Sequence, residues 1–183
     1  MTPQTRQEPA LKMHASLSAL PPLALRSGIE IRSFQEGDEA AWNHIISVSF
    51  ASPYDFNDHM KKDPAYKAER VLFALIDGVP VATAAAWQVD SVPADTGYLH
   101  MVGALPAYKG RQLGRVICLA ALHRLQQEGF SKVGLNTDDF RLPAIKTYLE
   151  LGFVPDLSIH ESMQARWENI HELLHNHKKE KSV

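Results

Sequence analysis

The chain has 183 residues, of which 45% are hydrophobic and 22% are charged, and its formal net charge is −2. This length suits one domain with short appendages, and the composition is that of a globular chain able to bury a core. The near-neutral charge offers no basic surface for nucleic acid or for an anionic membrane. No apolar stretch reaches the length of about 18 residues that a membrane span needs. We therefore expect no nucleic-acid partner and no membrane partner.

The first residues and the cysteine content indicate the compartment. The N-terminal sequence lacks the continuous apolar region of a signal peptide. Cys118 is the only cysteine, so no intrachain disulfide can form, and we expect a cytoplasmic location. Cys118 lies within an apolar helical pattern, which favours a core residue over a catalytic thiol.

Residues 1–28 are predicted to be an N-terminal extension, partly extended or disordered, because prolines interrupt them and no clear periodicity is present. Their apolar side chains could lie extended across the domain or across a partner subunit, which leaves a homodimer open. The apolar residues concerned are Leu17, Leu20, Leu23 and Leu25.

Hydrophobic periodicity predicts the elements of the next part. They are a strand over 29–34, a helix over 38–49, a short helix within 52–68, and strands over 71–76, 79–87 and 97–105. Asp38 is the expected N-cap of the first helix. Asp77-Gly78 is a two-residue hairpin signal between two of the strands. Pro80 indicates a strand start or a bulge in the second of them.

The remaining elements alternate between helix and strand. They are a helix over 112–128, a strand over 131–137, a helix capped by Asp138 or Asp139 and ending near Leu151, a short strand from Phe153, and an amphipathic helix over 162–175. A hairpin followed by βα units predicts an α/β fold with a mixed six- to seven-stranded sheet and helices on both faces. We expect the domain to span 29–158, followed over 159–183 by an extra C-terminal helix and a solvated tail.

The segment from His100 to Arg115, HMVGALPAYKGRQLGR, predicts a phosphate site. An apolar strand leads into a tight basic turn, and a long helix begins near Gln112. The first amides of a helix have no intrahelical acceptor and lie at the positive end of its dipole, so they bind phosphate well. Lys109 and Arg111 add charge beside them. Neither GxxxxGK[ST] nor GxGxxG occurs, which points to another phosphorylated cofactor, with plain scaffold as the alternative.

Two motifs resemble the GNAT superfamily of N-acyltransferases. LPAYKGRQLGRVICLAAL is similar to the family's acyl-coenzyme A pyrophosphate loop, and RLPAIKTYLELGF is similar to its ending. With the hairpin, the resemblance covers residues 29–155. It implies a GNAT-like fold and an enzyme that moves an acetyl group from acetyl-CoA to a primary amine of a small molecule or a peptide.

The resemblance also implies cofactor-binding residues. The main chain of Val102, Gly103 and Ala104 would pair with the pantetheine arm like an added strand. Arg141 occupies the position of an Asn that contacts the cofactor in many members. The pyrophosphate would be held by the amides of Lys109, Gly110, Arg111, Gln112, Leu113, Gly114 and Arg115. Lys109 and Gln112 depart from the family signature, which has Arg or Gln first and Gly fourth.

The resemblance makes Tyr148 the general acid. A tyrosine pKa of about 10 lies above a thiol pKa of roughly 8.5, so a phenol stays protonated and can donate to a leaving thiolate. His100 is the candidate base, because the amine must lose a proton before it attacks. A packed structural histidine and a core tyrosine are the alternatives. Other base candidates are Asp138, Asp139, His160 and Glu161.

The acceptor amine cannot be identified from these residues. Aromatic and acidic side chains of the variable loops and the C-terminal segment suit a small cationic amine. The residues concerned are Tyr54, Asp55, Phe56, Asp58, Trp87, Asp90 and Trp167.

Two rival functions remain. His171-Glu172-Leu173-Leu174-His175 matches the zinc-protease motif HExxH, but the GxxH extension is absent and few residues follow, so we expect no metal site. The second rival keeps the fold without catalysis, as an acyl-CoA sensor or a degenerate subunit.

Overall fold

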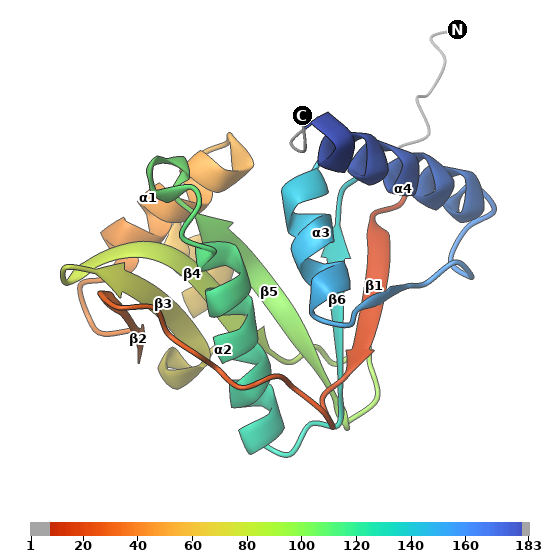
Figure 1. Cartoon of the computed structure of the whole chain (residues 1–183). Helices are drawn as coiled ribbons and strands as arrows, with labels where there is room; N and C mark the ends of the chain where they lie inside the picture. Colours follow the sequence, from red (N-terminus) through yellow and green to blue (C-terminus); the bar gives the residue numbers. More distant parts are fainter. Residues whose placement is uncertain (1–7, 181–183) are drawn as a thin grey trace, which may run out of the picture. The chain divides into compact units, whose positions relative to one another are not determined.

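A computed structural model describes residues 8–180, and the side chains of residues 8–176 (Figure 1). The strands are β1 (Leu11–Ser16), β2 (Ile29–Ser33), β3 (Val71–Ile76), β4 (Val79–Trp87), β5 (Thr96–Ala104), β6 (Lys132–Thr137) and β7 (Val154–Pro155). The α-helices are α1 (Glu39–Phe50), α2 (Leu113–Gln127), α3 (Leu142–Glu150) and α4 (Met163–Glu180). Short helical turns occupy Asn57–Lys61, Ala68–Arg70 and Pro106–Tyr108.

The predicted mixed sheet is confirmed. Seven strands form one sheet in the order β2-β3-β4-β5-β6-β1-β7. The pairs from β2 to β5 are antiparallel, and β5 pairs with β6 in parallel. The described chain divides into a larger compact unit, Ala15–Gly134, and a smaller one that combines residues 8–14 with residues 135–180.

Turn chemistry in the larger unit follows the sequence. Asp77 and Gly78 both have positive φ, which is the conformation of a tight hairpin turn, and they join β3 to β4 as predicted. The register shifts where Leu75 pairs with Pro80, so the predicted bulge is confirmed. Asp38 precedes α1 but makes no side-chain cap bond, because its carboxylate binds the Arg32 guanidinium instead.

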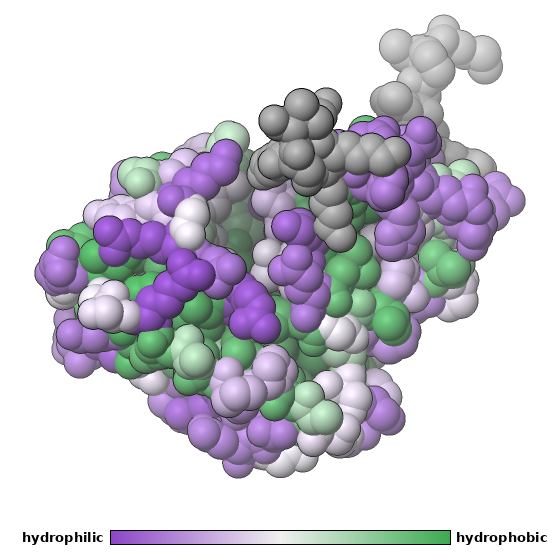
Figure 2. All heavy atoms as spheres, viewed as in Figure 1, coloured by the Kyte–Doolittle hydropathy of each residue, from purple (hydrophilic) through white to green (hydrophobic). Residues whose placement is uncertain are grey.

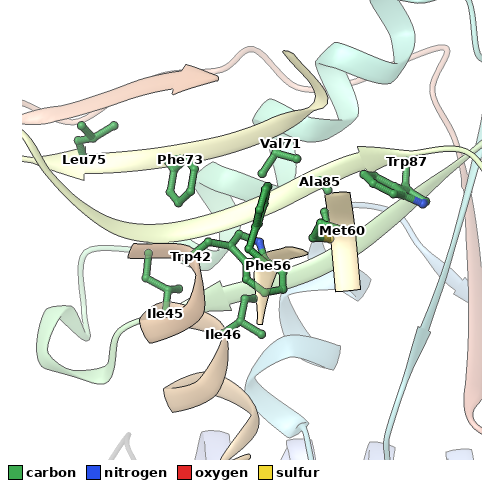
Figure 3. Packing of buried hydrophobic residues seen from close by; sticks show 10 residues of the cluster. All are labelled: Trp42, Ile45, Ile46, Phe56, Met60, Val71, Phe73, Leu75, Ala85 and Trp87. Atoms are coloured by element: carbon green, nitrogen blue, oxygen red, sulfur yellow. The ribbon is translucent and has the colours of Figure 1, made fainter. Parts of the chain in front are cut away.

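Helices α1 and α2 cover opposite faces of the sheet. On one face, aromatic and aliphatic side chains from α1, from the 57–61 turn and from β3 and β4 pack together (Figure 3). On the other face, α2 approaches so closely that a Cβ at Gly97 would lie 2.5 Å from Leu125 Cδ2. Cys118 is buried on α2, and burial raises the pKa of its thiol to about 12, so the prediction of a core residue is confirmed.

Strand β1 was missed by the sequence analysis. Leu11, Met13 and Ala15 are buried and alternate with exposed neighbours, which is the pattern of a half-buried strand. The following segment crosses α2 (Figure 1), where the His123 ring contacts the carbonyl of Pro21 at 2.9 Å. Part of the predicted extension therefore belongs to the folded sheet.

Helix α4 buries one face within the smaller unit. Met163, Trp167 and Ile170 are buried as predicted, and the surface over α4 is largely hydrophilic in Figure 2. Arg166 fixes the helix, because its guanidinium binds both carboxylate oxygens of Asp139 and the carbonyl of Pro9. Of the helices in residues 8–180, none is long and apolar enough to cross a membrane.

One buried ion pair allows a test of this fold. Arg70 is buried, and its Nε donates to Glu128 Oε2 at 2.7 Å, while Arg124 Nε reaches the other oxygen at 2.6 Å. We expect Glu128→Ala to lower the free energy of unfolding by about 3 kcal/mol, because it leaves a buried cation unpaired. Urea unfolding measures this loss.

The matched control is Asp58→Ala. It breaks the exposed pair with Lys62 and should cost no measurable stability. Equal losses in the two variants would contradict the importance of the buried pair.

Candidate functional site

Strand β5 contains a bulge near its middle. Thr83 pairs with Gly103. Two positions further along β4, Ala85 pairs with His100, so β5 holds one extra residue between the two pairs. Met101 lies there with a φ of 45°. An extra residue of this kind bends a strand and redirects its side chains.

The bulge places two consecutive side chains on the α1 face of the sheet. Met101 packs against the core cluster of Figure 3, and the His100 ring centroid lies 5.5 Å from that of Trp87. In an undisturbed strand these two neighbours would point to opposite faces. Within the larger unit, residues 96–98 of β5 pair with β6, and β5 pairs with β4 on both sides of the bulge.

Gly103 allows α1 to approach β5. A Cβ at this position would lie 2.9 Å from Ser49 Oγ and 3.0 Å from Ile46 Cδ1. Ser49 Oγ accepts a hydrogen bond from the Ala104 amide at 3.1 Å. Two residues of the predicted pantetheine-binding segment therefore already have partners within the chain. Gly103 pairs with β4, and the Ala104 amide donates to Ser49.

The turn before α2 has the conformation of an anion site. Gly110 has a φ of 89° and Gln112 a φ of 58°, so the chain reverses sharply just before the helix. Gln112 is the N-cap of α2 and provides no side-chain cap bond. The first amides of α2 thus lack the usual side-chain acceptor, and an external anion can take that place.

Cations surround this turn without neutralising partners. Lys109 and Arg111 are exposed and Arg115 is half-buried. None of the three forms an ion pair with another residue of the described chain. Leu113 is buried and anchors the helix start, whereas nothing lies within 4 Å of a Cβ at Gly114. Positive side chains beside an uncapped helix start suit a polyphosphate.

His100 is held as a neutral imidazole. Burial lowers its pKa to about 4, the charge of Asp63 opposes this shift, and the charge of His59 adds to it. Tyr98 lies beside it, with ring centroids 6.1 Å apart. A neutral imidazole can accept a proton or a hydrogen bond at neutral pH.

Tyr148 and Arg141 belong to the smaller unit. Tyr148 lies on α3, is buried, and has its ring centroid 5.9 Å from that of Phe153. Arg141 is the N-cap of α3, and its Nε donates to Asp138 Oδ2 at 3.0 Å. The predicted cap by Asp138 or Asp139 is therefore wrong, because both carboxylates bind arginines.

Most of the aromatics expected to contact the acceptor are core residues. Phe56 and Trp87 belong to the core cluster, and Trp167 is buried on α4. Tyr54 is half-buried, and its ring centroid lies 4.7 Å from that of His59. Phe56 and Trp87 are buried because the 57–61 turn and the end of β4 pack against α1, which local sequence does not reveal.

The HExxH match lies on α4. His171 and His175 are both exposed. Within the part of the chain that the structure describes, no three His, Cys, Asp or Glu side chains gather to hold a metal ion.

The sequence analysis missed Ser49 and the bulge at Met101. Ser49 follows the apolar face of α1 and carries no motif. No pattern in the sequence predicts that a residue other than glycine adopts a positive φ. The family resemblance covers this strand but does not by itself reveal the bulge.

These features define a mixed-sheet domain with a bulged strand leading to a phosphate-type turn and helix. Residues 37–153 match the Acetyltransferase (GNAT) family. Among solved structures, a GCN5-related N-acetyltransferase from Sphaerobacter thermophilus has a TM-score of 0.62 at 23% identity, over 81% of this chain and 50% of that one. An aminoglycoside N-acetyltransferase in complex with CoA has a TM-score of 0.57 at 16% identity, over 72% of this chain and 92% of that one. The chain belongs to the GNAT acetyltransferase family.

Its curated relatives are longer. A mycothiol acetyltransferase from Kytococcus sedentarius is 32% identical over 146 residues, which cover 74% of this chain and 49% of that protein. One from Thermomonospora curvata is 31% identical over 144 residues, covering 74% of this chain and 48% of that protein. The chain thus spans about half the length of these relatives.

The half-buried imidazole of His100 predicts a pH dependence of stability. Its pKa is about 4 in the folded chain, below the usual 6.5, so only the unfolded chain takes up this proton as the pH falls between these values. The free energy of unfolding should therefore fall as the pH falls through this range. We expect this fall to be smaller by roughly 2 kcal/mol in His100→Gln than in the wild type. Unfolding titrations at several pH values measure it, and parallel profiles for both proteins would contradict the shift.

The left-handed conformation of Gln112 predicts a second effect, on the free energy of unfolding. Its side chain costs energy at positive φ, whereas glycine adopts this conformation freely. We expect Gln112→Gly to raise the free energy of unfolding by about 0.5–1 kcal/mol. His44→Gly, at an exposed position in the interior of α1, is the control and should lower it by about 0.5 kcal/mol. A loss of stability in both variants would show that the turn does not strain Gln112.

Proposed function

We propose that this chain is an N-acetyltransferase that moves an acetyl group from acetyl-CoA to a primary amine. The observation that carries the proposal is the turn before α2, where left-handed residues and an uncapped helix start lie among unpaired cations. Family membership supports it, and so does the structural neighbour that is in complex with CoA.

In this proposal the main chain of the turn binds the pyrophosphate of CoA. The helix dipole and the amides from Lys109 to Arg115 favour a doubly charged group, and the side chains of Lys109 and Arg111 add Coulombic attraction. Gln112 replaces a family glycine, but its left-handed φ is that of the glycine conformation, so the amide path is kept. The thioester of the bound carrier supplies the activated acetyl group.

Tyr148 is proposed to protonate the leaving group. The amine nitrogen forms a bond to the thioester carbon, the carbon–sulfur bond breaks, and the sulfur keeps the electron pair. The phenol donates its proton to this thiolate, and the proton lost by the amine restores the phenol through solvent. This assignment rests on the family resemblance of the α3 motif.

His100 is proposed to bind the acceptor amine before the amine attacks the thioester. Its side chain lies on the α1 face of β5, and its neutral form accepts a hydrogen bond from the amine. With a pKa of about 4 it holds a proton poorly, so it passes that proton to water. We therefore assign it orientation of the amine and brief proton transfer.

The acceptor is proposed to be a small polar amine. Two relatives described above are mycothiol acetyltransferases, which makes amines related to mycothiol the first to test. This chain covers only about half of those proteins, so its acceptor can differ from theirs. The panel of amines to be tested therefore also includes peptide N-termini.

Tyr148→Phe tests the chemistry. We expect kcat to fall by about 10²–10⁴-fold while the affinity for CoA stays unchanged, because only the proton donor is lost. Initial rates with the best amine of the panel and calorimetric titration with CoA measure the two quantities.

The same measurements address the rival functions. Unchanged turnover in Tyr148→Phe would remove this residue as the acid. A wild-type protein that binds CoA and acetylates no amine would be a sensor instead of an enzyme.

A further inference from the structure

The hydroxyl of Ser49 links α1 to strand β5. Ser49 Oγ donates to the carbonyl of Ile45 at 2.7 Å, one turn back along the helix. The same oxygen accepts the amide of Ala104 at 3.1 Å. The Ala104 carbonyl also lies 3.4 Å from this oxygen, but the shorter contact to Ile45 takes its one proton, so the oxygen faces the Ala104 amide as an acceptor.

The pairing of β5 with β4 shows which side of β5 the amide of Ala104 faces. The amide of Leu105 donates to the carbonyl of Val81 at 2.9 Å, so the main chain of Leu105 faces β4. Main-chain groups of successive residues in a strand face opposite sides. The amide of Ala104 therefore turns away from β4. Neither Met101 nor Val102, which form the bulge, has a Cα partner there.

We propose that Ser49 is a positioning residue that selects Val102 as the main-chain site for the pantetheine arm. It occupies the Ala104 amide, so an arm that pairs like an added strand is directed to the main chain of Val102, the nearest preceding residue without a Cα partner in β4. This inference rests on the proposed function, because it presumes that CoA lies along β5.

Packing makes this arrangement firm. A Cβ at Gly103 would lie 2.9 Å from Ser49 Oγ, so the strand backbone rests directly against the hydroxyl. Ile45 and Ile46, seen in Figure 3, are fully buried and hold this turn of α1 in place. A ligand carbonyl that took the Ala104 amide would leave the hydroxyl without its second partner, which costs free energy in a half-buried site.

The first experiment compares two ligands. CoA has the arm, and 3′-phospho-ADP has the same phosphates without it. We expect Ser49→Ala to weaken CoA binding about five- to tenfold and to leave 3′-phospho-ADP binding unchanged, since only the arm contacts Val102. Calorimetry measures both affinities. Ser47→Ala is the matched control on α1, because its hydroxyl accepts the amide of Tyr54 instead of an amide of β5.

The second experiment needs no variant. Residue-resolved amide hydrogen exchange of the wild-type protein should show Ala104 protected with and without CoA, and Val102 protected only when CoA is added. Fast exchange of Ala104 in the free protein, or new protection of Ala104 on CoA binding, would overturn the inference.

The two ligands also separate this inference from the proposed function. If the wild type binds both ligands and Ser49→Ala binds them equally well, the role of Ser49 is wrong and the proposed function stands. If the wild type binds neither, the proposed function fails and the inference fails with it.

Discussion

The bulge in β5 is the constraint on which the larger unit of this protein depends. One extra residue at Met101 shifts the register with β4 and places His100 and Met101 on the same face. That face is covered by α1 and the core cluster, so a polar imidazole is held among aromatic rings. Beyond the bulge the strand pairs with β4 and leads directly into the turn before α2. One irregularity thus fixes the face of His100 on the strand that leads into this turn.

Glycines and left-handed residues allow the close approaches that this arrangement requires. Gly97 admits α2 on one face of β5, and Gly103 admits α1 on the other. Gly110 and Gln112 then adopt left-handed conformations just before α2, which begins without a side-chain cap bond. At the C-terminal end of α2, Arg70 and Arg124 both pair with the carboxylate of Glu128 and neutralise it. Rigid packing around the helix therefore supports a turn whose own side chains remain available to a ligand.

Charge and burial divide the tasks among the candidate residues. The exposed cations of the turn suit recognition of phosphate, because unpaired charge near a helix N-terminus attracts anions from solution. His100 is half-buried and neutral, which suits contact with an amine better than storage of a proton. Ser49 has no charge, and its influence would act entirely through a main-chain amide. A site built in this way depends more on backbone geometry than on any single reactive side chain.

The sequence by itself determined the local features: the Asp77-Gly78 hairpin, the extent of α2, the amphipathic face of α4, and the two motifs that carry the family. These depend on neighbours within a few residues, so periodicity and turn chemistry reveal them. The tertiary structure decided the rest. The bulge at Met101, the contact of Ser49 with Ala104, the strand formed by Leu11–Ser16 and the burial of Phe56 and Trp87 depend on pairing between residues far apart in the chain. Such pairing leaves no periodic signal in the segments themselves, because each partner is defined only when the sheet and helices pack together.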